Sequence, residues 1–167
     1  MDNLQALPVT MTTTKAGLAA GTTTTYSTTA TVIYGIRSKA FSKTAVTNGA
    51  TPTTDIVDGL AFTPLAFPPN ATSGGQGSVF VFAFNAAGTV GVAQGTVETL
   101  DVNGNFVIAP QFPVIPDTYC PFGYLVVKLG PTAVANWVFG TNNLSGVTGV
   151  TYTFVDVFTI PDRPQIS

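Results

Sequence analysis

Apolar and polar residues alternate along several short segments of the chain, and this alternation is the pattern of half-buried β-strands. In the clearest segment, Val32, Tyr34 and Ile36 fall on one face. Residues 78–85 are apolar on both faces, as expected for a strand in the middle of a sandwich or at a subunit interface. The strands that we expect are 31–36, 39–43, 78–85, 90–100, 106–108, 124–129, 135–139 and 150–160.

Glycine and proline separate these segments and leave little room for helices. The 17 glycines and 12 prolines recur too often for an apolar repeat over three helical turns, and the best helix candidate, 15–20, is short. Arg37 and Ser38 predict a hairpin turn, although Asn103-Gly104 is the stronger turn signal. Four prolines in 109–121 predict that this segment lies outside any sheet. We therefore predict an all-β fold, an antiparallel, jelly-roll-like β-sandwich of roughly eight strands.

Two regions depart from this pattern. Residues 1–30 are rich in threonine and predict an extended N-terminal arm or an edge strand, so we divide the chain into an arm, 1–30, and a single sandwich domain, 31–167. Removal of residues 2–20 should then leave the sandwich folded. The connection 47–70 is long for a compact domain, and its apolar residues argue against disorder. It either covers the open end of the sandwich or docks onto a neighbouring subunit. The candidate partner contacts in these two regions are Thr12, Thr14, Lys15, Leu60, Phe62, Leu65 and Phe67.

Charge is scarce along the whole chain. Only 8% of the 167 residues are charged, against roughly 25% in ordinary soluble domains. Because small domains depend on surface charge for solubility, we infer that much of this surface faces other protein. A net charge of −2 gives no reason to expect nucleic-acid binding, and the longest apolar run, 79–84, is too short to span a membrane.

The few charges are unevenly distributed. Residues 1–54 hold four cations and one acid, whereas residues 55–167 hold two cations and seven acids. This asymmetry predicts either solvated strand edges or a weakly basic face that binds an acidic partner or another copy of the chain.

The chain has few residues that could carry catalysis. It has no histidine, so imidazole general acid–base catalysis and imidazole metal ligation are excluded. Cys120 has no second cysteine for a disulfide or thiolate metal site, and no histidine to activate it. The segment 101–105 lacks the full residue order of a calcium loop, so we expect a plain turn. We therefore expect no enzymatic activity, no cofactor and no metal.

Five segments carry a resemblance that covers most of the chain: Thr47–Asp55, Val79–Val90, Ala93–Thr96, Ala109–Asp117 and Ile160–Pro164. In these segments the chain resembles a group of small structural proteins of tailed-phage virions. The resemblance implies a decoration or cement protein on the outer surface of the phage head. Its partner would be the major capsid protein, and it would assemble as a homo-oligomer, a trimer or a dimer.

A low-charge β surface suits this function, since a protein that binds only the assembled shell stabilises it, and many identical contacts add avidity. An alternative from another class is an adhesin on the tail or fibre, a carbohydrate-binding β-sandwich. Such a module depends on exposed aromatic residues. The candidates are Trp137 and the tyrosines Tyr26, Tyr34, Tyr119, Tyr124 and Tyr152, although their strand positions predict that most of them lie in the core.

Overall fold

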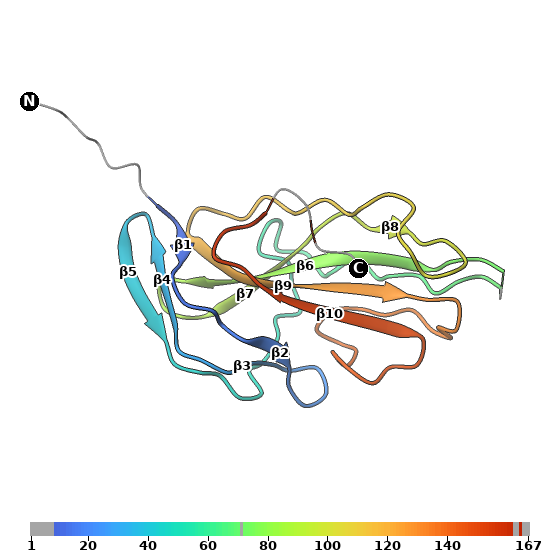
Figure 1. Ribbon diagram of the computed structural model, residues 1–167, viewed down its shortest axis with the longest axis horizontal. Coiled ribbons are helices and arrows are strands. Elements are labelled where there is room, and N and C mark those ends of the chain that lie inside the picture. Colours follow the sequence, from blue (N-terminus) through green and yellow to red (C-terminus); the bar gives the residue numbers. More distant parts are fainter. Residues whose placement is uncertain (1–8, 71, 162–163, 165–167) are drawn as a thin grey trace, which may run out of the picture.

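The computed structural model describes residues 9–70, 72–161 and 164, and these residues form ten β-strands and no helix (Figure 1). Within these ranges no helix is long and apolar enough to cross a membrane. All strand pairs are antiparallel, so the predicted all-β fold is confirmed. The strands are β1 (Met11–Thr12), β2 (Leu18–Ala20), β3 (Tyr26–Thr28), β4 (Val32–Ile36), β5 (Lys39–Lys43), β6 (Gln76–Asn85), β7 (Val90–Gln94), β8 (Glu98–Thr99), β9 (Tyr119–Leu129) and β10 (Val150–Asp156).

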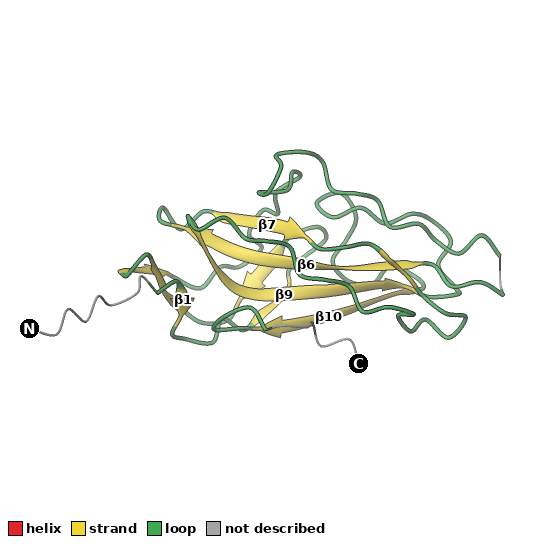
Figure 2. Ribbon diagram, turned by 90° about the horizontal axis from the view of Figure 1, so that it is seen from above, coloured by secondary structure: helices red, strands yellow, loops and turns green. Residues whose placement is uncertain are grey.

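A five-stranded sheet forms the body of the molecule. Its order is β10-β9-β6-β7, with the short β8 also paired to β6, and Figure 2 shows the four longer strands side by side in this order. A three-stranded sheet, β1-β4-β5, and a two-stranded sheet, β2-β3, complete the set. The arrangement is a β-sandwich in which one layer is a large sheet and the other is made of small sheets and loops.

The large sheet is buried on both faces. On one face, the phenylalanines of β6 pack against Phe122 of β9, and the rings of Phe84 and Phe122 stack with centroids 4.1 Å apart. The small sheets and the loops carrying Trp137 and Phe139 cover this face. On the other face, Val79 and Val81 of β6 pack under Phe112 and neighbouring apolar residues. This double burial explains why residues 79–84 are apolar at every position.

Proline is the reason for one error in the strand predictions. We expected residues up to Pro121 to lie outside any sheet, but β9 begins at Tyr119 and contains Pro121, opposite Ala83 of β6. The register shifts at this point, so that Phe122 is an extra residue on β9. Proline lacks the N–H that a regular ladder needs, and a β-bulge is one of the few places in a sheet that tolerates it.

Other predicted elements are shorter than expected or are not strands. The predicted strand 90–100 is interrupted between β7 and β8. Residues 106–108 and 135–139 contribute only isolated bridges, Phe106 to Leu100 and Trp137 to Leu65. The helix candidate 15–20 is wrong, since its second half forms β2. The strand segments have too few neighbours in hydrogen-bonding register to form full strands, whereas the helix candidate pairs with β3 instead.

Residues 9–30, the described part of the predicted arm, lie against the rest of the fold. Strand β1 pairs with β4, and the Thr12 N–H donates to the carbonyl oxygen of Phe158 over 3.0 Å. Ala16 and Leu18 are buried in the main core. β1 is therefore an edge strand, as the second of our two alternatives for this region predicted. Removal of residues 2–20 would take the buried side chains of Ala16 and Leu18 out of the core, so it would not leave the sandwich intact.

The central aromatic cluster predicts a large cost for truncation of its middle ring. Phe82 is fully buried and contacts the rings of Tyr26, Phe122 and Phe139. Phe82→Ala should lower the free energy of unfolding by about 3–5 kcal/mol, measured by urea denaturation. Val134→Ala is the matched control, because Val134 is 76% exposed, and it should change stability by less than about 0.5 kcal/mol. Equal effects of the two substitutions would contradict this description of the core.

Candidate functional surface

The acidic residues and Cys120 are the residues of the described chain that could ligate a metal ion or carry nucleophilic chemistry. Among the described residues, no group of three or more acids or cysteines lies close enough to hold a metal ion. Cys120 is fully buried, and desolvation raises the pKa of its thiol to about 11, so the thiol is protonated at neutral pH.

The Asp101 turn accounts for the sequence that partly resembles a calcium loop. The Oδ1 atom of Asp101 accepts hydrogen bonds from the backbone N–H groups of Asn103 and Asn105, each 2.8 Å long. The bond from Asn105 is the largest cause of the lowered pKa of this carboxyl. The carboxylate therefore organises its own loop, which is the plain turn predicted from the sequence.

The aromatic residues proposed for a carbohydrate-binding module lie inside the molecule or partly inside it. Trp137 is buried and its indole Nε1–H donates to the carbonyl oxygen of Asn143 over 3.1 Å. Tyr26, Tyr34 and Tyr124 are also buried, and Tyr119 and Tyr152 are half-buried. The prediction that most of these aromatic residues belong to the core is confirmed, and none of the six side chains is largely exposed.

Three of the seven predicted partner contacts are internal. Thr12 is fully buried, and its hydroxyl donates to the carbonyl oxygen of Val157 over 2.7 Å. Phe62 and Leu65 are buried in the main core, where the Phe62 ring lies 4.9 Å from that of Phe139. The part of the connection that holds Phe62 and Leu65 therefore covers the sandwich. The prediction that Thr12, Phe62 and Leu65 contact a partner is corrected, because all three side chains are buried within the chain.

The other four predicted contacts reach the surface to different degrees. Thr14 is half-buried and its hydroxyl accepts a hydrogen bond from the Ile33 N–H. Lys15 is exposed and lies 4.0 Å from Asp156. Leu60 and Phe67 are exposed apolar residues of the long connection. The four residues come from two separate regions of the chain, and the described contacts do not bring them into one cluster.

A surface that the sequence predictions missed lies on the proline-rich segment 106–116, which we call the strap. Phe106, Phe112 and Ile115 of the strap pack onto the second face of the large sheet. Val107, Ile108 and Val114 point away from that face and are 66%, 66% and 85% exposed. The prolines were interpreted only as a reason against a strand, although an extended segment with apolar residues on opposite sides must expose one of the two sets.

The strap is fixed in place by backbone and ring contacts. Gln111 and Thr96 exchange two hydrogen bonds, of 2.9 and 3.2 Å, and the Val107 N–H donates to the carbonyl oxygen of Thr99. The Phe112 ring packs edge-on against Tyr124 with centroids 5.0 Å apart. The exposed valines and isoleucine are thus held on a preformed surface.

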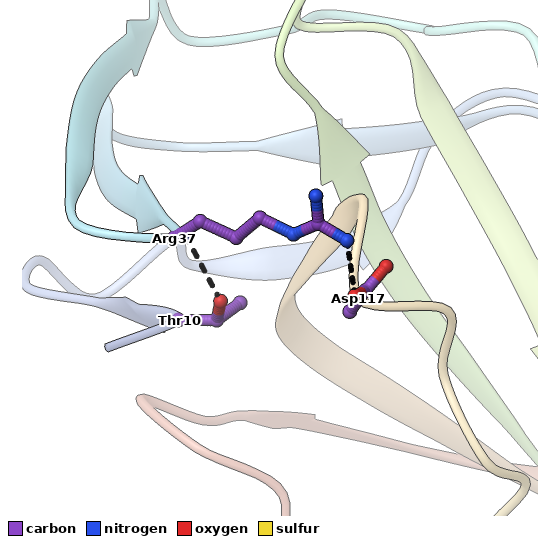
Figure 3. Close-up of polar contacts among 3 residues, drawn as sticks. All are labelled: Thr10, Arg37 and Asp117. Carbon is purple, nitrogen blue, oxygen red and sulfur yellow. Dashed lines mark hydrogen bonds and ion pairs between the residues drawn. The ribbon is translucent and has the colours of Figure 1, made fainter. Parts of the chain in front are cut away.

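The tip of the β4–β5 hairpin is the second unusual surface feature. Arg37 and Ser38 have φ angles of +49° and +64°, so they form a two-residue turn that Asn-Gly ordinarily occupies. Three contacts secure it. Arg37 pairs with Asp117, and the Arg37 N–H donates to the hydroxyl of Thr10 (Figure 3). The Ser38 N–H donates to the Val9 carbonyl oxygen. The hairpin turn predicted at these two residues is confirmed.

Comparison with known proteins adds no relative. No protein-family model matches the chain, and no curated protein or solved structure matches it either. The resemblance to phage virion proteins therefore stays a prediction from the five sequence segments, and the surface of the chain is the basis for inferring its function.

The left-handed turn predicts an unusual response to glycine. Ser38→Gly relieves the steric cost of a positive φ, and it also removes the hydrogen bond that the Ser38 hydroxyl accepts from the Val9 N–H. Because the relief of steric cost is the larger effect, the free energy of unfolding should rise by about 0.5–1 kcal/mol. Ser42→Gly, the same substitution four residues later within β5, should lower it by about 0.5–1 kcal/mol. Urea denaturation of both variants tests the opposite signs, and two destabilised variants would contradict the description of the turn.

Burial of Cys120 predicts a loss of stability in alkaline solution. Its pKa is about 11 in the folded protein and 9.0 in the absence of burial. The unfolded chain releases this proton first, so the stabilisation is complete below pH 9 and declines as the pH rises towards 11. Urea denaturation at pH 7, 9 and 11 should show this decline, and Cys120→Ala should reduce its slope. An unchanged slope in the variant would mean that Cys120 does not cause it.

Proposed function

We propose that this chain is a structural protein of a phage virion, a decoration or cement protein that binds the major capsid protein on the outer surface of the head. The observation that carries the proposal is the strap, which displays Val107, Ile108 and Val114 on a surface with few charges. Large apolar side chains held out into water on an ordered segment are characteristic of protein-binding surfaces.

The energetics of the strap support protein–protein contact. Burial of a valine or isoleucine side chain contributes about 1.5–3 kcal/mol, so the three exposed residues together could supply several kcal/mol to an interface. The hydrogen bonds and prolines of the strap have already restricted its backbone, which reduces the entropy lost on binding. The strap therefore has the composition and the rigidity of a binding surface.

Repetition on a lattice would multiply a contact of this size. A single strap gives a modest interface, but a dimer or trimer of the chain would place several straps on neighbouring capsid subunits, and each later contact would form at high effective concentration. Because such binding requires the assembled shell, it would stabilise the shell relative to free subunits. We include the homo-oligomer in the proposal for this reason.

The structure gives less support to an adhesin. Trp137 and the five tyrosines lie in the interior or partly in it, so a carbohydrate would find no aromatic platform among them. We therefore propose binding to the phage head in preference to carbohydrate binding at the tail or fibre.

The proposal predicts which surface substitution weakens attachment. On purified virions that carry the chain, the wild-type protein should be present in many copies over the head. The double variant Ile108→Asp/Val114→Asp should be present in at least about tenfold fewer copies, because carboxylates replace apolar contacts. Gel densitometry of purified particles measures the copy number.

Val134→Asp is the matched control, since Val134 is an exposed valine outside the strap. It should attach as the wild type does. Circular dichroism and urea denaturation of both variants establish that each is folded. Location at the tail tip alone, or equal loss of attachment for the two folded variants, would contradict the proposal.

A further inference from the structure

Most sheet edges in the described part of the chain are occupied by other segments. The outer edge of β7 receives a hydrogen bond from Ile56, whose N–H donates to the Val92 carbonyl oxygen over 3.0 Å. The outer edge of β1 bonds the chain after β10, through Thr12 and Phe158, and β3 bonds residues 46–49. The outer strand β10 lies beside β2, with the Leu18 N–H bonded to the Asp156 carboxylate.

Strand β5 is arranged differently. It is the last strand of its sheet and lies at the outer end of the molecule (Figure 1). The two residues that flank a two-residue hairpin turn form a hydrogen-bonded pair, here Ile36 and Lys39. Alternation then directs the N–H and C=O groups of Ala40 and Ser42 away from β4, and no backbone hydrogen bond within the described chain occupies them.

The open edge is rigid. Phe41, between the two open residues, stacks on Tyr34 with ring centroids 5.7 Å apart, and Tyr34 is buried in the main core. The turn at one end of β5 is held by the contacts of Arg37 and Ser38. A strand that is already extended and fixed loses little entropy when a second strand pairs with it.

The charge of this edge is positive. Lys39 and Lys43 stand at the two ends of β5, while the other nearby cation, Arg37, is paired with Asp117. Residues 9–54 contain no acid, so this part of the chain supplies no carboxylate to neutralise the two lysines. An antiparallel second copy of β5 centred on Phe41 would place Lys39 opposite Lys43, which is unfavourable. Strand pairing with carboxylates at those positions would be favourable.

We propose that the outer edge of β5 is a strand-addition site for an extended acidic segment of a partner protein. The backbone groups of Ala40 and Ser42 supply the hydrogen bonds, and the ammonium groups of Lys39 and Lys43 select carboxylates. Lysines at a sheet edge commonly prevent unwanted pairing, and here the same two lysines exclude a second copy while they admit an acidic strand. This inference stands on β5 alone and does not depend on attachment to a capsid.

The test uses the complete, isotopically labelled chain and a short capped peptide of alternating glutamate and valine. Titration with this peptide should shift the amide resonances of Ala40 and Ser42 and slow their hydrogen exchange. A peptide with glutamine in place of glutamate should bind about tenfold more weakly, because its two charge pairs with the lysines are lost.

Charge-reversed variants supply the specificity control. The double variant Lys39→Glu/Lys43→Glu should no longer bind the glutamate peptide and should bind a lysine peptide instead. Lys15→Glu changes a cation outside the hairpin and should bind the glutamate peptide as the wild type does. Urea denaturation confirms that both variants fold.

Three results would overturn the proposal. The Ala40 and Ser42 amides could remain unchanged at millimolar glutamate peptide, or the glutamine peptide could bind equally well. Concentration-dependent protection of the same two amides without peptide would identify a second copy as the occupant. None of these results bears on occupancy of virions, so this inference and the proposed function can fail separately.

Discussion

Burial of both faces of β6 is the constraint on which the rest of the structure depends. The strand has eight consecutive buried residues, from Gly77 to Phe84, and an exposed face would place a row of phenylalanines or valines in water. One face needs the small sheets and the long connection, and the other needs the strap. Because the inner residues of the strap are held by the sheet, its outer residues are fixed at the surface, and the exposed apolar side of the strap follows from the packing of the core.

Hydroxyl groups perform much of the structural work that charges do in other small domains. The chain has 28 threonines, while ion pairs between described residues include Lys15 with Asp156 and Arg37 with Asp117. Threonine hydroxyls instead bond backbone groups of distant segments, as Thr12 does with Val157 and Thr28 with Val46. No buried polar side-chain atom in the described part of the chain lacks a hydrogen-bond partner. The surface therefore carries few charged groups that would have to be desolvated when another protein binds.

The sequence pattern predicted local structure well and tertiary coverage poorly. Alternation located the hairpin of β4 and β5 and the doubly buried β6, because each side chain's face follows directly from strand geometry. It could not show which segment covers a face. Pro121 lies within a strand only because the opposite strand accommodates a bulge, and Phe62 and Leu65 are buried while Leu60 and Phe67 are exposed along a connection without regular periodicity. Contacts between segments distant in sequence decide these cases.

The proposed function joins these features, since a sandwich of low charge that presents an ordered apolar strap is suited to contacts on a repeating protein lattice. Cryo-electron microscopy of virions that carry the chain, at a resolution that traces side chains, tests this central claim most directly. We expect density for the chain over the head, with residues 106–116 packed against capsid subunits. Density on the head with the strap facing solvent, or density confined to the tail, would contradict it.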